Sequence, residues 1–488
     1  MRSLPLLSRF RPLATAFGLA LLAFSPGCDD GVETNSDNVT DIKNSKVKNQ
    51  SIGNCWIYAT VGWAESLHLT HTGTELNLSE SYVTYWHWFE QISGAKDQVK
   101  LSSLSASGEI ETGGFFGIAV EIMLRYGVMD EGAFIPAEAE AQLSQRQEDA
   151  LAAINKSLTT GKLKTEKART DKALVRAELD KAWQLSANTS GKLDTAFGKS
   201  VFKTLYSTTK KLPTGLRYAR SIAIGTAQAD NKTVKLSLAD AIGTGATPDN
   251  PFQRVGKHAW TEVYYPKGAQ SRREFQIRAQ RVLHERLPVV MSWFVDFNSM
   301  DDTGAFRAAP ATPGHQGGHM TVLEDYQVTD VPGFGTLEAG VLVTDPAALS
   351  AALDPAAKIE FFRVKNSWGT DLAPPEGAAE FRGYHDLYTK YVDGLLTQCT
   401  EANGDPCGTK SNVYGMTSLI LPPASFQSAG VGAEGCHDVC VAGAPMAASC
   451  GSCAADVCAA DAFCCNPAGG WDAACVSQVA SVCGQTCQ

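Results

Sequence analysis

The chain has 488 residues, of which 44% are hydrophobic and 19% are charged, and its formal net charge is −10. This length allows two or three domains with sizeable cores. The balanced composition excludes disordered, collagen-like and coiled-coil chains. Because the charge balance is acidic, we expect no nucleic-acid partner.

The first 27 residues are typical of an export signal. A basic start precedes the apolar stretch Leu13–Phe24, which is too short to span a membrane but has the length of a signal h-region. Gly27 then precedes Cys28. This junction resembles the lipobox of bacterial lipoproteins, in which the cysteine becomes N-terminal and lipidated, although Ser25 stands where Leu is usual. An ordinary secretory signal is the alternative.

Either signal predicts an exported protein. We expect it to be lipid-anchored at the bacterial cell envelope, at the outer membrane, or else secreted. The polar stretch after Cys28, rich in Asp and Asn, predicts a flexible tether over residues 28–45.

A cysteine stands at the start of a predicted helix. Gly53 marks a loop ahead of Cys55, and apolar residues then recur at helical spacing until Gly73 ends the pattern. Free N–H groups and the dipole at a helix start favour a thiolate, so we expect Cys55 to be a nucleophile for acyl transfer. Gln50 is an amide donor suited to an oxyanion hole. The alternative is a buried structural cysteine.

Two later segments supply a base and a group to orient it. His319 follows two glycines and opens a strand-like run, and a second predicted strand, residues 361–365, ends at Asn366. A third apolar strand is predicted at Pro288–Asp296. These residue types fit a Cys-His-Asn arrangement.

The segments around Cys55 and Asn366, Asn-Gln…Gly-Asn-Cys-Trp and Lys-Asn-Ser-Trp-Gly, strongly resemble papain-like cysteine peptidases, and are most similar to the bleomycin hydrolase (aminopeptidase C) branch. Leu78–Tyr82 and Gly113–Phe116 also fit. The resemblance covers about residues 46–422. It implies an α+β, two-lobed fold with a cleft between a helical half and a β-rich half.

The resemblance also implies a role for each matching residue. Cys55 would be the nucleophile, His319 the general base and acid, Asn366 the group that orients the imidazole, and Gln50 the oxyanion donor. Trp368 would shield the His–Asn hydrogen bond from water. Among competing histidines, His258 precedes the Pro288–Asp296 strand and no strand-like run directly follows His315, so we favour His319.

The spacing departs from the family. Cys55 and His319 are 264 residues apart, against about 130–150 in papain. An Ala-, Lys- and Glu-rich stretch, residues 138–220, predicts a helical insertion that accounts for most of the difference. Residues 151–220 carry 15 Lys and Arg against five Asp and Glu, which we interpret as a solvated helical face. The gap before Asn366 leaves room for a hairpin at Gly333–Val343.

The C-terminal residues are predicted to form a separate unit. A Gly/Ala/Ser-rich linker, residues 423–435, leads to a cysteine-rich module at 436–488, which at this density predicts disulfides. The expected disulfide cysteines are Cys436, Cys440, Cys450, Cys453, Cys458, Cys464, Cys465, Cys475, Cys483 and Cys487. Half a zinc site at Cys450 and Cys453 is the alternative. Cys399 and Cys407 flank a turn-like sequence and are expected to pair.

We therefore predict an exported cysteine peptidase that hydrolyses peptide or protein substrates through a thioester, without metal or organic cofactor. Endopeptidase and aminopeptidase action remain open, because the chain continues about 120 residues past Asn366. Two other hypotheses remain: a catalytically silent papain-like surface binding protein, and an acyltransferase using the same triad.

Overall fold

The structure is a computed structural model. It describes residues 42–94, 103–135, 144–206, 209–229, 232–247, 250–370, 381–402, 405–423 and 426–427, and, near the C-terminus, 439–440, 442, 446, 450, 452–465, 471–483 and 487. The predicted signal, Cys28, Cys436 and most of the tether and linker lie outside these residues. Within them, no helix is long and apolar enough to cross a membrane.

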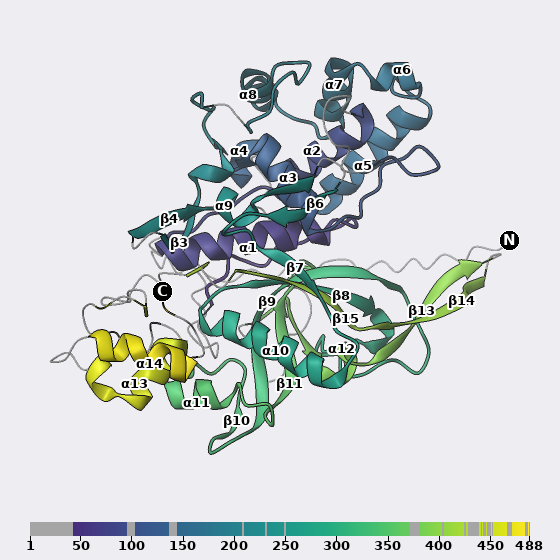
Figure 1. Cartoon of the computed structure of the whole chain (residues 1–488). Coiled ribbons are helices and arrows are strands. Elements are labelled where there is room, and N and C mark those ends of the chain that lie inside the picture. Colours follow the sequence, from purple (N-terminus) through teal and green to yellow (C-terminus); the bar gives the residue numbers. More distant parts are fainter. Residues whose placement is uncertain are drawn as a thin grey trace, which may run out of the picture. The chain divides into compact units, whose positions relative to one another are not determined.

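One half of the fold is mainly helical (Figure 1). The helix α1 begins at Cys55 and is buried along almost its whole length, which explains its apolar character on every side. It ends where Gly73 takes a left-handed conformation, as predicted. The helices are α1 (Cys55–Thr72), α2 (Glu80–Ser93), α3 (Phe116–Tyr126), α4 (Glu131–Phe134), α5 (Ser144–Thr159), α6 (Glu166–Arg169), α7 (Lys172–Ala182), α8 (Ala187–Phe197) and α9 (Leu238–Ile242).

The helical insertion predicted over residues 138–220 contains α5 to α8, and its helices end at Phe197. Lys162, Lys164 and Lys167 are exposed, in agreement with a solvated face. Arg176 is an exception, because it is buried and donates to the Tyr85 hydroxyl.

Short strand pairs follow in the same half, and the sequence pattern did not reveal them. All of these pairs are antiparallel. They are β1 (Val128–Met129) with β2 (Leu216–Arg217), β3 (Ala223–Ala229) with β4 (Lys232–Ser237) and β16 (Phe426–Gln427), and β5 (Thr244–Thr247) with β6 (Asn250–Val255); a 3₁₀ turn η1 (Ala219–Ser221) precedes β3.

The other half is built on an antiparallel sheet of order β12-β11-β9-β8-β15-β7, with β10 paired to β9. Its elements are β7 (Thr261–Tyr264), α10 (Ala269–His284), β8 (Val289–Asp296), η2 (Phe297–Ser299), β9 (Gln316–Val331), β10 (Gly335–Leu337), α11 (Pro346–Ala351), β11 (Lys358–Lys365), β12 (Tyr384–Tyr388), α12 (Thr389–Val392) and β15 (Met416–Leu421). The strand predicted at Pro288–Asp296 is confirmed as β8, and the hairpin predicted at Gly333–Val343 is the β9–β10 turn with the loop after it. The predicted α+β class is confirmed.

The strand register sets the positions of two candidate site residues. His319 pairs with Trp293 across β8 and β9, and Lys365, the residue before Asn366, pairs with Val322 across β9 and β11. The ends of neighbouring strands therefore bring His319 and Asn366 together. The helix α1 packs against the same sheet, since its residues share a buried core with Met320 and Val322.

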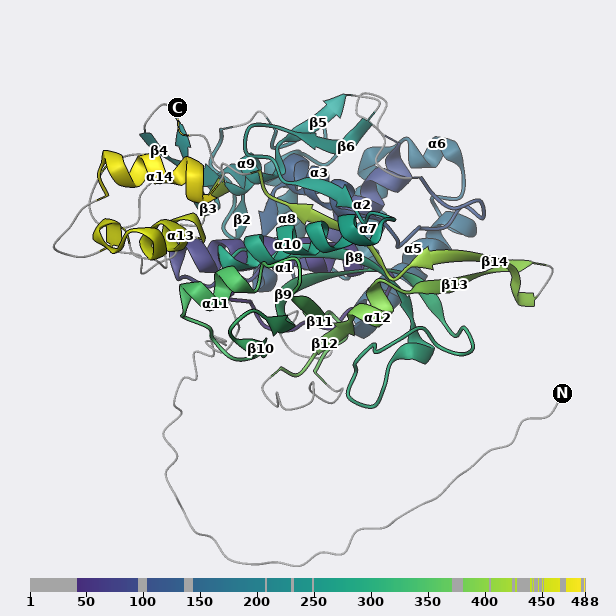
Figure 2. The same cartoon turned by 60° about the horizontal axis from the view of Figure 1, so that its bottom comes forward.

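A twisted hairpin, β13 (Leu395–Ala402) with β14 (Asp405–Tyr414), extends away from the sheet (Figure 2). Cys399 and Cys407 form a disulfide across it. The predicted surface loop is thus a stapled hairpin.

The C-terminal module contains α13 (Ser452–Ala460), η4 (Ala462–Cys465) and α14 (Ala473–Cys483) around the buried Trp471. Its disulfides join Cys440 to Cys487, Cys453 to Cys483, Cys458 to Cys465 and Cys464 to Cys475. Cys450 is also disulfide-bonded. The alternative of a zinc site at Cys450 and Cys453 is therefore wrong.

Candidate active site

Cys55 is the first residue of α1, and it is the free cysteine among the described residues. Its thiol is buried, with 8% of the residue exposed. Backbone N–H groups of Cys55, Trp56 and Met320 bond to the sulfur. Because Met320 follows His319 on β9, the fold brings the thiol beside the strand that carries the candidate base.

His319 and Asn366 form a direct hydrogen bond. The distance from His319 Nε2 to Asn366 Oδ1 is 2.7 Å, and both residues are buried. An amide oxygen only accepts, so Nε2 carries the proton and Nδ1 is left as the basic nitrogen. Asn366 Oδ1 also accepts from the Ser367 N–H at 2.8 Å, which fixes the amide.

Trp368 covers this pair. Its ring stacks on the His319 imidazole with centroids 4.6 Å apart and an interplanar angle of 22°. Trp293 meets His319 edge-on at 5.3 Å, and Phe297 packs on Trp368 at 5.1 Å. The aromatic groups exclude water from the imidazole and hold its plane.

Burial sets the protonation of both groups. It raises the pKa of the Cys55 thiol to about 11, although the backbone N–H groups lower it. Burial also lowers the pKa of His319 to about 4, although the bond to Asn366 raises it. The helix start, which was expected to favour a thiolate, is therefore opposed by desolvation, which has the larger effect on the Cys55 pKa.

Gln50 lies in the extended segment before α1. Its backbone N–H donates to the Ser367 carbonyl at 2.8 Å, and its Oε1 accepts from the Ser367 hydroxyl. Its Nε2 donates one proton to the Ile52 carbonyl at 3.0 Å. The amide has a second N–H, so it can also serve an oxyanion beside Cys55.

Replacing Gln50 by alanine tests that role. We expect a loss of roughly 10²–10³ in kcat, the usual effect of removing one oxyanion donor, with a smaller change in KM. Steady-state kinetics on a peptide substrate measure it. Ser367→Ala is the control, since it removes a hydrogen bond to Gln50 while leaving the amide donor, and it is expected to have the milder effect.

The loop before α3 fits closely over Trp56. Trp56 Nε1 donates to the Thr112 carbonyl at 3.0 Å. A Cβ on Gly114 would lie 2.5 Å from the Trp56 ring, so glycine is required at this crossing. The segment Gly113–Phe116, noted in the sequence, therefore holds the tryptophan that follows the candidate nucleophile.

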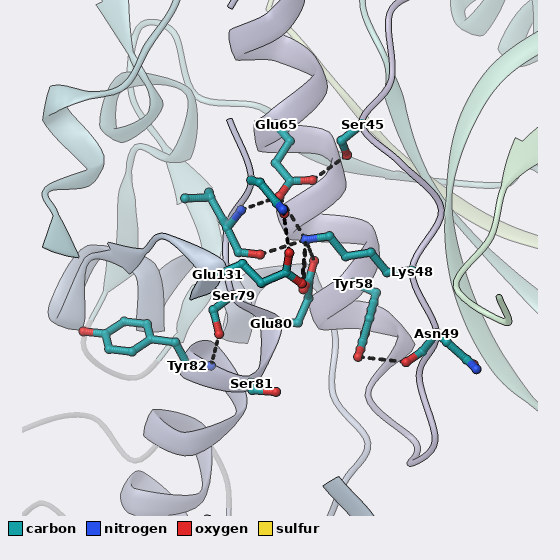
Figure 3. Close-up of polar contacts among 12 residues, drawn as sticks. Ser45, Lys48, Asn49, Tyr58, Glu65, Ser79, Glu80, Ser81, Tyr82 and Glu131 are labelled. Atoms are coloured by element: carbon teal, nitrogen blue, oxygen red, sulfur yellow. Dashed lines mark hydrogen bonds and ion pairs between the residues drawn. The ribbon is translucent and has the colours of Figure 1, made fainter. Parts of the chain in front are cut away.

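Figure 3 shows a buried group of charges that the sequence did not reveal. Lys48 Nζ lies 2.9 Å from Glu80, 3.1 Å from Glu65 and 3.9 Å from Glu131. It also donates to the Leu78 carbonyl at 2.8 Å. These carboxylates come from α1, α2 and α4, so one lysine of the extended segment ties three helices together.

The same group reaches the sheet. Ser45 donates to Glu65 and accepts from Lys365 Nζ at 2.9 Å. Burial lowers the pKa of Lys365 to about 8. Burial lowers the pKa of Lys48, but the neighbouring glutamates raise it. The net result is a pKa well above the usual value of a lysine. We call Ser45, Lys48, Glu65, Glu80, Glu131 and Lys365 the buried ionic cluster.

The buried ionic cluster holds the segment that carries Gln50. Next to Lys48, Asn49 forms a β-bridge with Trp368, and the Lys48 carbonyl accepts from the Gly369 N–H at 3.1 Å. A sequence signal existed: Glu65 is a charged residue within the otherwise apolar α1. Its partners are far away in the sequence, so the position of Glu65 in the helix does not identify them.

The alternative histidines lie elsewhere. His258 follows β6 and lines a cavity of about 410 Å³ with Tyr206, Arg220 and Lys257. The residues described around that cavity include neither Cys55 nor Asn366. The His315 carbonyl accepts from Phe297 N–H, and no side-chain contact with the site is described for it. Among His258, His315 and His319, it is therefore His319 that is described in contact with Asn366.

Over the described ranges, no group of three or more His, Cys, Asp or Glu side chains could hold a metal ion.

The family described as "Domain of unknown function (DUF8252)" matches residues 434–487, within the C-terminal segment. No curated protein matches the chain.

Solved structures with some likeness include three proteins. Bromelain protease from Ananas comosus, in complex with the E64 inhibitor, is 15% identical over 78% of this chain and 93% of its own, with a TM-score of 0.29. PepW from Lactobacillus rhamnosis is 13% identical over 80% and 82%, with a TM-score of 0.36. The clostridial cysteine protease Cwp84 is 11% identical over 78% and 56%, with a TM-score of 0.28. These scores are too low to carry an inference about this chain.

Proposed function

We propose that the protein is an exported cysteine peptidase that hydrolyses peptide bonds through Cys55, His319 and Asn366. The observation that carries the proposal is the His319–Asn366 hydrogen bond of 2.7 Å beneath Trp368, next to a free thiol at a helix start. A base oriented by a fixed amide, beside a nucleophile, is the geometry that acyl transfer requires.

The reaction starts from the neutral pair. The Cys55 thiol gives its proton to His319 Nδ1 as the sulfur attacks the substrate carbonyl. The Gln50 amide and the Cys55 backbone N–H stabilise the oxyanion. His319 then protonates the leaving amine, which leaves a thioester on Cys55. The imidazole next removes a proton from water as the water oxygen attacks the thioester carbonyl. The C–S bond then breaks, the acid is released, and the imidazolium returns the proton to the Cys55 sulfur.

An epoxysuccinyl probe tests this assignment on the purified, unreduced protein. The probe should label Cys55, located by mass mapping of peptides, and should abolish peptide hydrolysis. Labelling without any turnover of peptides would instead support a binding protein, and transfer of the acyl group to added amines in preference to water would support an acyltransferase. Absence of labelling at Cys55 would overturn the proposal.

The dependence of activity on pH follows from burial of the base. His319 must be neutral to accept the thiol proton, and its pKa is lowered to about 4. We therefore expect kcat/KM to be lost as the pH falls through about 4 and to stay high as the pH rises from there. An acid limb near 6.5, the value of an exposed histidine, would contradict this prediction.

Export and anchoring are part of the proposal. Five disulfides are present among the described residues, which favours an oxidising compartment. Cys28→Ala should move the protein from the membrane fraction to the soluble fraction. A wild-type protein that is already soluble, with an N-terminus other than residue 28, would rule out the lipid anchor.

A further inference from the structure

A second histidine is buried behind the candidate base. His385 lies on β12, where it pairs with Val364 of β11, two residues before Asn366. It has no exposed surface. Its Nδ1 lies 2.7 Å from the Gly304 carbonyl. No step of the mechanism above uses this side chain.

The hydrogen bond defines the state of the ring. A carbonyl only accepts, so Nδ1 carries the proton and Nε2 is bare in the neutral imidazole. Nε2 is buried and has no hydrogen-bond partner among the described residues. A buried unpaired acceptor is costly, and an aliphatic side chain would fill the position without that cost. Filling space therefore does not explain a histidine here.

The contacts of His385 lead to the active site. Its ring meets the Trp368 indole edge-on, with centroids 5.1 Å apart at 69°. Trp368 in turn stacks on His319. On its other side, His385 is fixed to Gly304, in a turn that Asp301 holds through the Thr303 and Ala305 N–H groups.

We propose that His385 is a positioning residue, whose Nδ1–H bond to Gly304 sets the ring edge against which Trp368 rests, and so holds the indole flat on His319. The inference rests on the proposed function, because it deepens the role of the same site. Without the bond, the imidazole can turn about its χ2 angle, and the indole loses a fixed neighbour. His319 would then be held less accurately for proton transfer.

Burial favours the neutral form of the His385 ring, although the nearby Asp386 opposes it. The adjacent Asp386 carboxylate is bound by Arg363 at 2.9 and 3.1 Å, so it is committed elsewhere. Burial lowers the pKa of His385.

Two amide substitutions separate positioning from mere filling. The amide nitrogen of asparagine takes the place of Nδ1, whereas that of glutamine takes the place of Nε2. His385→Asn should keep the bond to Gly304 but loses the ring edge that faces Trp368, so we expect it to lower kcat by less than His385→Gln does. His385→Gln should lower kcat about tenfold or more, with KM changed by less than about twofold, because small misplacements cost catalysis more than binding. Both variants stay polar and are compared by thermal unfolding as well.

His284 provides the matched control. It is a half-buried histidine, and its bond to the Tyr326 hydroxyl at 2.6 Å uses Nε2. Because glutamine replaces Nε2, His284→Gln should destabilise the protein less than His284→Asn does, the reverse of the order at His385. We expect kcat to be unchanged in both His284 variants.

Equal kcat in His385→Asn and His385→Gln, in a wild type that is active and labelled by the epoxysuccinyl probe, would overturn the positioning role. A wild type that neither turns over peptide nor reacts with the probe would overturn the proposed function instead.

Discussion

Replacing Cys55 by serine is expected to lower kcat for peptide hydrolysis by roughly 10⁴-fold or more, the scale seen when a nucleophile is removed from a catalytic unit. The hydroxyl is a poorer nucleophile, and the surrounding N–H groups cannot compensate for the loss of sulfur. The fold should remain, because serine is nearly the same size and can accept the same backbone bonds from Trp56 and Met320. Turnover of a fluorogenic peptide and a thermal unfolding curve measure both effects.

Asn366→Ala is a useful companion. It removes the partner of His319 Nε2 but keeps the nucleophile, so labelling of Cys55 should slow but continue. A Cys55→Ser protein that hydrolyses peptide at the wild-type rate would exclude Cys55 as the nucleophile, and the whole mechanism with it.

Replacing Lys48 by methionine is expected to destabilise the protein by about 3–5 kcal/mol at neutral pH, the usual cost of leaving buried carboxylates without their cation. Lys48 contacts Glu65 and Glu80, which are almost fully buried, and lies 3.9 Å from Glu131. Methionine retains most of the side-chain volume, so the effect measures charge. Urea unfolding gives the change in the free energy of unfolding.

The pH dependence of this loss identifies its cause. Burial already raises the pKa of Glu80 and of Glu131. Without Lys48 these carboxyl groups bind protons more readily in the folded state, so the variant should recover part of its deficit as the pH falls toward 5. A deficit that is constant with pH would indicate a packing effect instead.

Lys162→Met is the matched control. Lys162 also pairs with a glutamate, Glu178, at 3.0 Å, but 67% of its side chain is exposed. Solvent screens such a pair, so the loss should be about 0–1 kcal/mol. If both lysine variants lose the same stability, the buried ionic cluster is not a stabilising element.

The consequences of losing Lys48 extend to catalysis. The Lys48 backbone and its neighbours, Asn49 and Gln50, bind Gly369, Trp368 and Ser367. These contacts connect the buried ionic cluster to the loop after Asn366. We therefore expect Lys48→Met to lower kcat even under conditions in which it is fully folded.

The sequence by itself determined the local features. The apolar spacing after Cys55 and the glycine at position 73 define α1, because a helix start and end depend on neighbouring residues. The apolar run at β8 and the strands ahead of Asn366 and after His319 are likewise local patterns. The high density of cysteines predicted disulfides without fixing which of them pair.

The chemistry of the site depends on residues that are far apart in the chain. A helix start favours a thiolate, yet burial raises the pKa of Cys55 to about 11, although the N–H of Met320, 265 positions along the chain, lowers it. In the sequence, Lys48 and Glu80 look like ordinary surface charges, and only the fold places both of them in a buried group with Glu65. Nothing in the sequence distinguishes His385 from the other histidines, and its contact with Trp368 appears only in the folded structure. Desolvation and charge pairing depend on which distant segments come into contact, and a local sequence pattern does not specify those contacts.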